Sequence, residues 1–171
     1  MSKYRNPLLF LPAHIDQGIS SFDVEVNPDL VGLEAYKFHA PIQCKLDFER
    51  IGDRIDLSMS LVAGIEVACS KCGKPTRIDI QTTYKVTFLP AADDEDEEIT
   101  ATDLELYSDI LNLTPILRDA FLLAIPIAPL CRQGCKGLCP VCGVNLNQGD
   151  CNCDKTKRVS PFEELKRLVN E

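Results

Sequence analysis

The chain has 171 residues, of which 45% are hydrophobic, enough for one domain with a core and a small additional module. Its net charge of −8 argues against a surface that wraps nucleic acid, because such a surface needs a basic footprint. No apolar run approaches the roughly 18 residues of a membrane-spanning helix, so we expect no membrane partner.

The first residues do not resemble a secretory signal. The apolar run 8–11 is too short for a signal core, and Pro7 and Pro12 flank it. We therefore expect a cytoplasmic protein. A reducing cytoplasm disfavours structural disulfides, so closely spaced cysteines there more often bind metal or perform redox chemistry. The count of nine cysteines would in any case leave one thiol unpaired.

Alternation of apolar and polar residues predicts strands along the first half of the chain. The alternating segments are 22–26, 36–48, 55–69 and 78–88. Gly52-Asp53 makes a turn between the second and third segments, and Cys69–Pro75 joins the third to the fourth. Such short connections predict an antiparallel sheet with one buried face. Pro41 indicates that its strand lies at an edge or is bulged.

An acidic block and a helix follow the last predicted strand. The six consecutive acids of Asp93–Glu98 repel one another and predict a solvated loop over 91–99. The segment 112–125 is then typical of a helix, with Thr114 as its N-cap and Pro115 at the first helical position.

These elements predict an α+β fold: an antiparallel β-sheet that forms a meander, with a barrel-like form as one option, packed with one or two helices. We assign this sheet and helix domain to residues 1–130. Residues 131–171 are expected to form a Cys-rich zinc-binding module with a C-terminal helix, which begins at the capping box Ser160–Glu163. Charge separates the two parts, because 1–130 carry 11 Lys and Arg against 21 Asp and Glu, whereas 131–171 carry 7 against 5.

Two Cys-x-x-Cys-Gly units are the strongest motifs in the sequence. They are Cys69–Gly73, at a predicted hairpin tip, and Cys139–Gly143. Two thiolates at this spacing grip one tetrahedral metal ion, and the glycine permits a tight turn. With four further cysteines they supply enough ligands for two zinc ions, each held by four cysteines, and two ions are preferred over one. The candidate metal ligands are Cys69, Cys72, Cys131, Cys135, Cys139, Cys142, Cys151 and Cys153.

The sequence leaves open how these ligands combine. They come in four close pairs, which begin at Cys69, Cys131, Cys139 and Cys151. We prefer a local site made by the third and fourth pairs, so that the first and second pairs tie the hairpin to the segment after the helix. A rival arrangement joins the second pair with the third and the first with the fourth, and a third option is one zinc ion with several free thiols. Cys44 has apolar neighbours at i±2 and is expected to be a core residue.

No motif calls for an enzyme. A catalytic zinc keeps one ligand position open, usually among His and carboxylate ligands, whereas a site of four cysteines is closed and structural. The sequence contains no Gly-x-Ser-x-Gly, no phosphate-binding glycine loop and no His-Glu-x-x-His. We therefore expect no catalytic residue and no small-molecule substrate.

Several motifs occur in a set order. They are Cys69–Pro75, Asp109–Leu113, Leu117–Pro126, Pro129–Cys131, Cys135–Asn147, Cys151–Cys153 and Pro161–Leu165. This set, spread over about residues 40–170, resembles the YceD family, the large ribosomal RNA accumulation proteins. The resemblance assigns the eight cysteines as metal-ligand candidates. The family usually has an acidic residue followed by Gln early in the long helix, where this chain has Asp119-Ala120.

The resemblance implies a non-enzymatic ribosome biogenesis factor, stabilised by zinc, that promotes accumulation or processing of large-subunit ribosomal RNA. Its expected partner is ribosomal RNA or a large-subunit ribosomal protein, met by Lys136, Lys155, Lys157 and Arg158. The acidic loop suits a basic protein better than RNA. Two alternatives are a zinc-dependent protein-interaction module without a ribosomal role and a thiol redox or zinc sensor.

Overall fold

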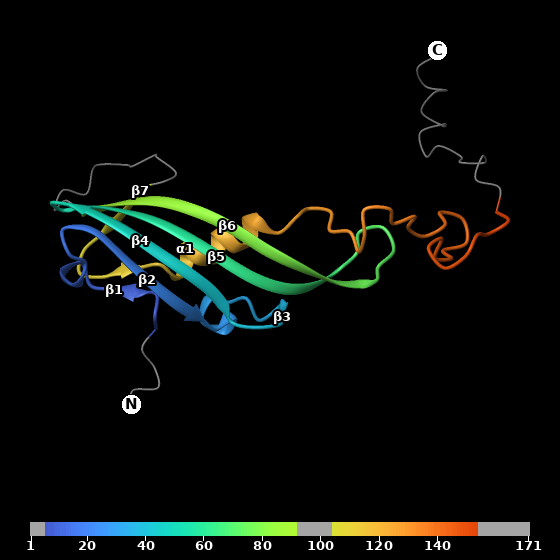
Figure 1. The fold of residues 1–171 in the computed structure, drawn as a ribbon, viewed down its shortest axis with the longest axis horizontal. Coiled ribbons are helices and arrows are strands. Elements are labelled where there is room, and N and C mark those ends of the chain that lie inside the picture. The colour runs from blue at the N-terminus through green and yellow to red at the C-terminus, as the bar shows by residue number, and fades with distance from the viewer. Residues whose placement is uncertain (1–5, 92–103, 154–171) are drawn as a thin grey trace, which may run out of the picture.

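The computed structural model describes residues 6–91 and 104–153 (Figure 1). Its strands are β1 (Leu9–Phe10), β2 (Gly18–Val26), β3 (Lys37–Phe38), β4 (Ile42–Ile51), β5 (Arg54–Ala68), β6 (Pro75–Pro90), β7 (Leu104–Tyr107) and β8 (Leu111–Asn112). Its helices are the short 3-10 helices η1 (Pro12–His14) and η2 (Pro28–Val31) and the α-helix α1 (Thr114–Ala124). The predictions for the acidic block and for the C-terminal helix fall outside the described residues.

Six strands form one open sheet in the order β2-β4-β5-β6-β7, with β3 beside β5. The predicted antiparallel pairing is confirmed from β2 to β6, whereas β7 runs parallel to β6. The barrel-like form is wrong: β2 and β7 lie at opposite ends of the strand order, and α1 covers the face that a barrel would enclose. Within the described residues, the fold is therefore a mostly antiparallel, open sheet with one α-helix on one face.

Pro41 lies at an interruption that splits one predicted strand into β3 and β4. Phe38 pairs with Ile65 and Gln43 pairs with Val62, so four residues of this segment stand opposite two residues of β5. The bulge expected from proline is confirmed, but β4 is an interior strand between β2 and β5 rather than an edge.

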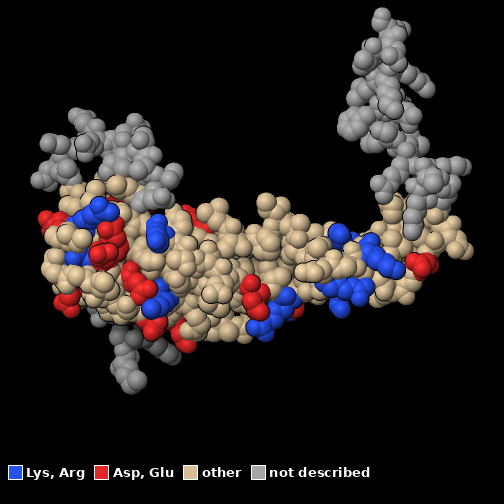
Figure 2. Space-filling view, turned by 45° about the horizontal axis from the view of Figure 1, so that its top comes forward, with Lys and Arg blue, Asp and Glu red and all other residues tan. Residues whose placement is uncertain are grey.

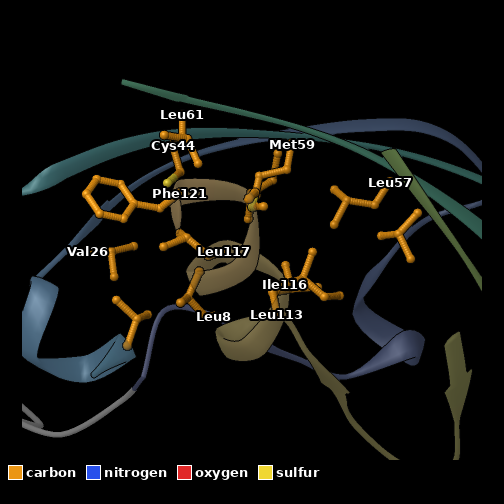
Figure 3. Packing of buried hydrophobic residues seen from close by; sticks show 14 of the residues in the cluster. Leu8, Val26, Cys44, Leu57, Met59, Leu61, Leu113, Ile116, Leu117 and Phe121 are labelled. Atoms are coloured by element: carbon orange, nitrogen blue, oxygen red, sulfur yellow. The ribbon is translucent and has the colours of Figure 1, made fainter. Parts of the chain in front are cut away.

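The core lies between the sheet and α1 (Figure 3). Leu117 and Phe121 of the helix are fully buried there, and the Phe121 ring lies 5.2 Å from Phe38 and 5.6 Å from Tyr36, measured between ring centroids. Each buried Leu or Phe side chain contributes about 1.5–3 kcal/mol relative to an exposed one. The helix therefore completes a core that the open sheet cannot enclose by itself.

The start of α1 differs from the prediction. Asn112 belongs to β8, and its side chain accepts a hydrogen bond from the backbone N–H of Thr114 at 3.1 Å. The Thr114 hydroxyl accepts from Asn6 Nδ2 at 3.2 Å instead of capping the helix. Thr114 is thus the first helical residue rather than the N-cap, because Asn6 supplies a tertiary partner for its side chain.

The β5–β6 hairpin extends beyond the rest of the sheet and carries Cys69 and Cys72 at its tip. Its last paired residues are Ala68 and Pro75. The chain after α1 runs beside this tip and continues past it, as the orange segment in Figure 1 shows. We call the hairpin tip, residues 69–74, together with residues 129–153 the arm.

Candidate metal centres

The first cysteine cluster begins at the turn that closes the β5–β6 hairpin. The N–H of Cys69 donates to the carbonyl of Lys74 at 2.9 Å, and the N–H of Gly73 donates back to the carbonyl of Cys69 at 2.8 Å. Gly73 has φ +70°, in the left-handed region that a residue without Cβ enters at low cost. This turn holds the thiols of Cys69 and Cys72 in the same cluster.

The chain after α1 supplies the other two sulfurs. The N–H of Ser70 donates to the carbonyl of Pro129 at 2.8 Å, which places Cys131 and Cys135 over the hairpin tip. The sulfurs of Cys69 and Cys135 lie 3.8 Å apart, and so do those of Cys72 and Cys131. All four sulfurs lie within 4.8 Å of one another.

The second cluster repeats the same local turn. The N–H of Cys139 donates to the carbonyl of Val144 at 2.8 Å, and the N–H of Gly143 donates to the carbonyl of Cys139 at 2.9 Å. Gly143 has φ +73°, close to the value at the first turn. The second cluster comprises Cys139, Cys142, Cys151 and Cys153, whose sulfurs also lie within 4.8 Å of one another.

The geometry of both clusters fits zinc. With a Zn–S bond of about 2.3 Å, a tetrahedral site places its sulfurs about 3.8 Å apart, whereas a disulfide needs about 2.05 Å. The two sulfur distances of 3.8 Å in the first cluster match the edges of such a tetrahedron. The donor set is four thiols in each cluster, without His or carboxylate, which is the set of a closed structural zinc site.

Backbone N–H groups favour the thiolate at the first cysteine of each turn. The N–H of Cys131 contributes most to lowering the pKa of the Cys69 thiol to about 6. The N–H of Cys142 has the same effect at the second cluster, where the pKa of Cys139 is also about 6. Because zinc binds the thiolate, these two positions are ready to bind metal at neutral pH.

One thiol in each cluster has a raised pKa, Cys131 in the first and Cys153 in the second. Burial raises the pKa of Cys131 to about 12, and the neighbouring Cys142 sulfur raises that of Cys153 to about 12. Several thiolates cannot crowd together without a cation between them. A divalent cation would displace these protons and neutralise part of the charge.

The structure groups the eight predicted ligands as two sets of four, in the preferred combination. The rival combination is not assembled, because the pair that begins at Cys131 meets the hairpin tip rather than the pair that begins at Cys139. Cys44 lies apart from both clusters in the core, 3% exposed, and burial raises its pKa to about 12.

Asn147 is a site residue that the sequence pattern did not single out. Its side-chain N–H donates to the sulfur of Cys135 at 3.4 Å. The only sequence signal for it is the pair Asn145 and Asn147 between two cysteine pairs, a spacing that also suits an ordinary turn.

No helix in the described parts of the chain is long and apolar enough to cross a membrane.

Comparisons with known proteins place these clusters in a family context. A sequence model of the family described as "Large ribosomal RNA subunit accumulation protein YceD" matches residues 57–169, more than half of the chain. This match contains all eight cysteines of the two clusters. No solved structure matches the chain.

Individual relatives share a quarter to a third of their aligned residues with this chain. An uncharacterized protein of Mycobacterium tuberculosis is 28% identical over 128 residues, which cover 72% of this chain and 61% of that protein. The chloroplastic YCED homolog 1 of Arabidopsis thaliana, named as a large ribosomal RNA subunit accumulation protein, is 25% identical over 166 residues, covering 80% of this chain and 52% of the relative. The homolog of the same name from Zea mays is 32% identical over 104 residues, covering 60% and 29%. The chain thus spans about half to three fifths of the length of the first two relatives.

Proposed function

Because the chain belongs to the YceD family, we propose that it is a ribosome biogenesis factor that promotes accumulation or processing of large-subunit ribosomal RNA. The observation that carries this proposal is the family match over 57–169, which includes both cysteine clusters. The Arabidopsis relative is named as a large ribosomal RNA subunit accumulation protein, which supports the accumulation part of this proposal. We also propose that the protein is cytoplasmic, since a ribosome biogenesis factor acts where ribosomes are assembled.

We further propose that each cluster holds one zinc ion, with all eight cysteines as ligands. Zinc bound by four thiolates would act as a structural cross-link. In the first cluster, Cys69 and Cys72 bring the hairpin tip, while Cys131 and Cys135 bring the chain after α1. Metal at this position would fix the direction in which the arm leaves the sheet.

The proposed role is binding rather than catalysis. A tetrahedral ion with four cysteine ligands has no position for a substrate. Grouping of the thiols in fours, with the nearest sulfurs of the first cluster 3.8 Å apart, also favours a metal site over a redox pair. A redox sensor would require Cys69 and Cys72 to form a disulfide in preference to sharing an ion with two other thiols.

The charge of the arm supports contact with RNA. Within its described segments the arm has more basic than acidic residues. The basic residues are Lys71, Lys74, Arg132 and Lys136, and the acidic residue is Asp150. Figure 2 shows Lys and Arg gathered along this part of the molecule. Two loaded sites would add about −4 of thiolate and zinc charge; the cysteines of the first site are mostly buried, whereas Cys142, Cys151 and Cys153 of the second are at least partly exposed, so the RNA contact is proposed beside the first site. The exposed cations are therefore the groups that a phosphate would meet.

The sheet offers a different surface. A shallow groove on the face away from α1 is lined by Asp47, Glu49 and Asp56, with Lys85 as the one cation among its lining residues. Two of these carboxylates already pair with cations, Asp47 with Lys45 at 3.4 Å and Asp56 with Arg54 at 2.9 Å, so the groove is close to neutral. We propose that a basic large-subunit ribosomal protein contacts the acidic block Asp93–Glu98 while the arm contacts ribosomal RNA.

Depletion and rescue test the function. Loss of the protein is expected to lower large-subunit ribosomal RNA relative to small-subunit ribosomal RNA, and the parent chain is expected to restore the ratio. Cys72→Ser and Cys142→Ser should not restore it, since each removes one ligand from a cluster. An unchanged ratio on depletion would refute the proposed function.

Crosslinking tests the assignment of surfaces. Lys136→Glu should reduce recovery of crosslinked large-subunit RNA, whereas Lys45→Glu, a control on the sheet face, should not. Capture of non-ribosomal proteins in place of ribosomal components would favour an interaction module without a ribosomal role.

A further inference from the structure

The two cysteine clusters share a short junction. Three residues, Lys136–Leu138, join Cys135 of the first cluster to Cys139 of the second. The N–H of Leu138 donates to the carbonyl of Lys71 at 3.1 Å, so this junction is hydrogen bonded to the hairpin tip. Movement at one cluster is therefore transmitted through few bonds to the other.

Asn147 reaches across this junction. It lies between the two cysteine pairs of the second cluster, yet its side-chain N–H donates to the Cys135 sulfur of the first cluster at 3.4 Å. Its side-chain oxygen accepts from the N–H of Lys136 at 2.9 Å and from Arg132 Nη2 at 2.8 Å. One amide thus contacts a ligand sulfur and the backbone beside it.

Neighbouring residues in the loop between Cys142 and Cys151 hold Asn147 in place. The N–H of Leu146 donates to the carbonyl of Gly137 at 2.9 Å, and both the backbone and side-chain N–H groups of Asn147 donate to Asn145 Oδ1, at 3.0 and 2.9 Å. These residues lie in the loop that Cys142 and Cys151 close. A metal ion that closes this loop would therefore hold Asn147 beside Cys135.

Gly137 allows the junction to lie against the backbone of the hairpin tip. It has φ +77°, and a Cβ at this position would lie 3.1 Å from the backbone carbonyl oxygen of Lys71. Contact with backbone cannot be relieved by a side-chain rotation. The approach of the junction to the hairpin tip therefore requires glycine.

We propose that Asn147 is a positioning residue for Cys135 and that, through it, the two clusters bind zinc cooperatively. This inference rests on the proposed zinc sites. Closing the second cluster fixes Asn147, whose N–H···S bond orients Cys135. Loss of such a partner to a ligand typically lowers metal affinity by about 10- to 100-fold. Coupling between two binding sites is reciprocal, so zinc at either cluster raises the zinc affinity of the other cluster by the same factor.

The test is zinc binding by the whole chain, measured as zinc per chain and as affinity in competition with a chromophoric chelator. The parent is expected to bind two zinc ions. Asn147→Ala should still bind two, but one of them about 10-fold or more weakly. Asn152→Ala is the matched control, because Asn152 lies between two ligands and makes no side-chain hydrogen bond among the described residues. It should bind as the parent does.

Ligand variants test the cooperativity. Cys142→Ser should weaken the remaining first site, and Cys72→Ser should weaken the remaining second site, by similar factors. In the Cys142→Ser background, adding Asn147→Ala should cause little further loss of zinc affinity at the first site, since the second cluster no longer holds Asn147 in position. Gly137→Ala, whose Cβ would push the junction a few tenths of an ångström away from the hairpin tip, should reduce the coupling without removing a ligand.

The outcomes separate this inference from the proposed sites. Two zinc ions per parent chain, with Asn147→Ala and Asn152→Ala both at parent affinity, would overturn the coupling and leave the zinc sites intact. Fewer than two zinc ions in the parent would overturn both. Circular dichroism of each variant checks that a lost affinity does not reflect a lost fold.

Discussion

Alanine in place of Gly73 or Gly143 isolates the backbone of the two cysteine turns. Both glycines have positive φ, +70° and +73°, and an added Cβ would meet nothing within 4 Å at either position. Steric clash with neighbours is therefore absent, and the only cost of alanine is the left-handed conformation itself. Gly149, which also has open space but no positive φ, gives a matched control.

The expected magnitude follows from that single cost. A residue with a Cβ in the left-handed region costs roughly 1–2 kcal/mol. Since about 1.4 kcal/mol is a factor of ten in affinity, each variant should bind its zinc about 5- to 30-fold more weakly. Gly149→Ala should bind as tightly as the parent or slightly better, because alanine there restricts the unfolded chain.

Chelator competition on the whole chain measures the three variants against the parent. Gly73→Ala and Gly143→Ala should each show one weakened and one normal site of the two, apart from any coupling between the clusters. The similar φ values predict losses of similar size. If Gly73→Ala and Gly143→Ala kept parent affinity within a factor of two while binding two zinc ions, the positive-φ turns would not be part of the metal-bound state.

Three further predictions concern the core and the thiols. Leu117→Ala should lower the free energy of unfolding of the zinc-loaded chain by about 3–5 kcal/mol in chemical denaturation, because the side chain is fully buried between α1 and the sheet; a loss below about 1 kcal/mol would contradict this packing. Cys44→Ser should lower the free energy of unfolding by about 1–3 kcal/mol, since it buries a hydroxyl among apolar side chains. Cys44→Val should lower it by less than about 1.5 kcal/mol. Equal losses for the two variants would argue against an apolar surrounding of Cys44. Zinc affinity should fall with decreasing pH, and should fall more steeply below about pH 6. The pKa values of Cys69 and Cys139 are lowered to about 6, so these two thiols become protonated below that pH. Protons then compete with zinc for two more ligands. A pH profile whose slope does not increase below pH 6 would show that these two thiolates are not preformed.

Local patterns predicted most of the fold. Period-2 alternation placed the strands because a sheet with one buried face imposes it, and the predicted helix is present with Leu117 and Phe121 buried. The same patterns did not reveal the parallel direction of β7, whose four residues are too few to indicate a partner. Thr114 resembled an N-cap because propensity describes a residue without its tertiary partner, here Asn6.

The sequence by itself determined which residues belong to each close cysteine pair and the glycine that follows two of them, since a turn of a few residues depends on its own backbone and side chains. Only the tertiary structure decided which pairs meet. Cys72 and Cys131 are 59 residues apart, and nothing in their spacing shows that β5, β6 and α1 bring their sulfurs to 3.8 Å. The role of Asn147 was likewise set by the fold, because its contact with Cys135 exists only where the two clusters adjoin.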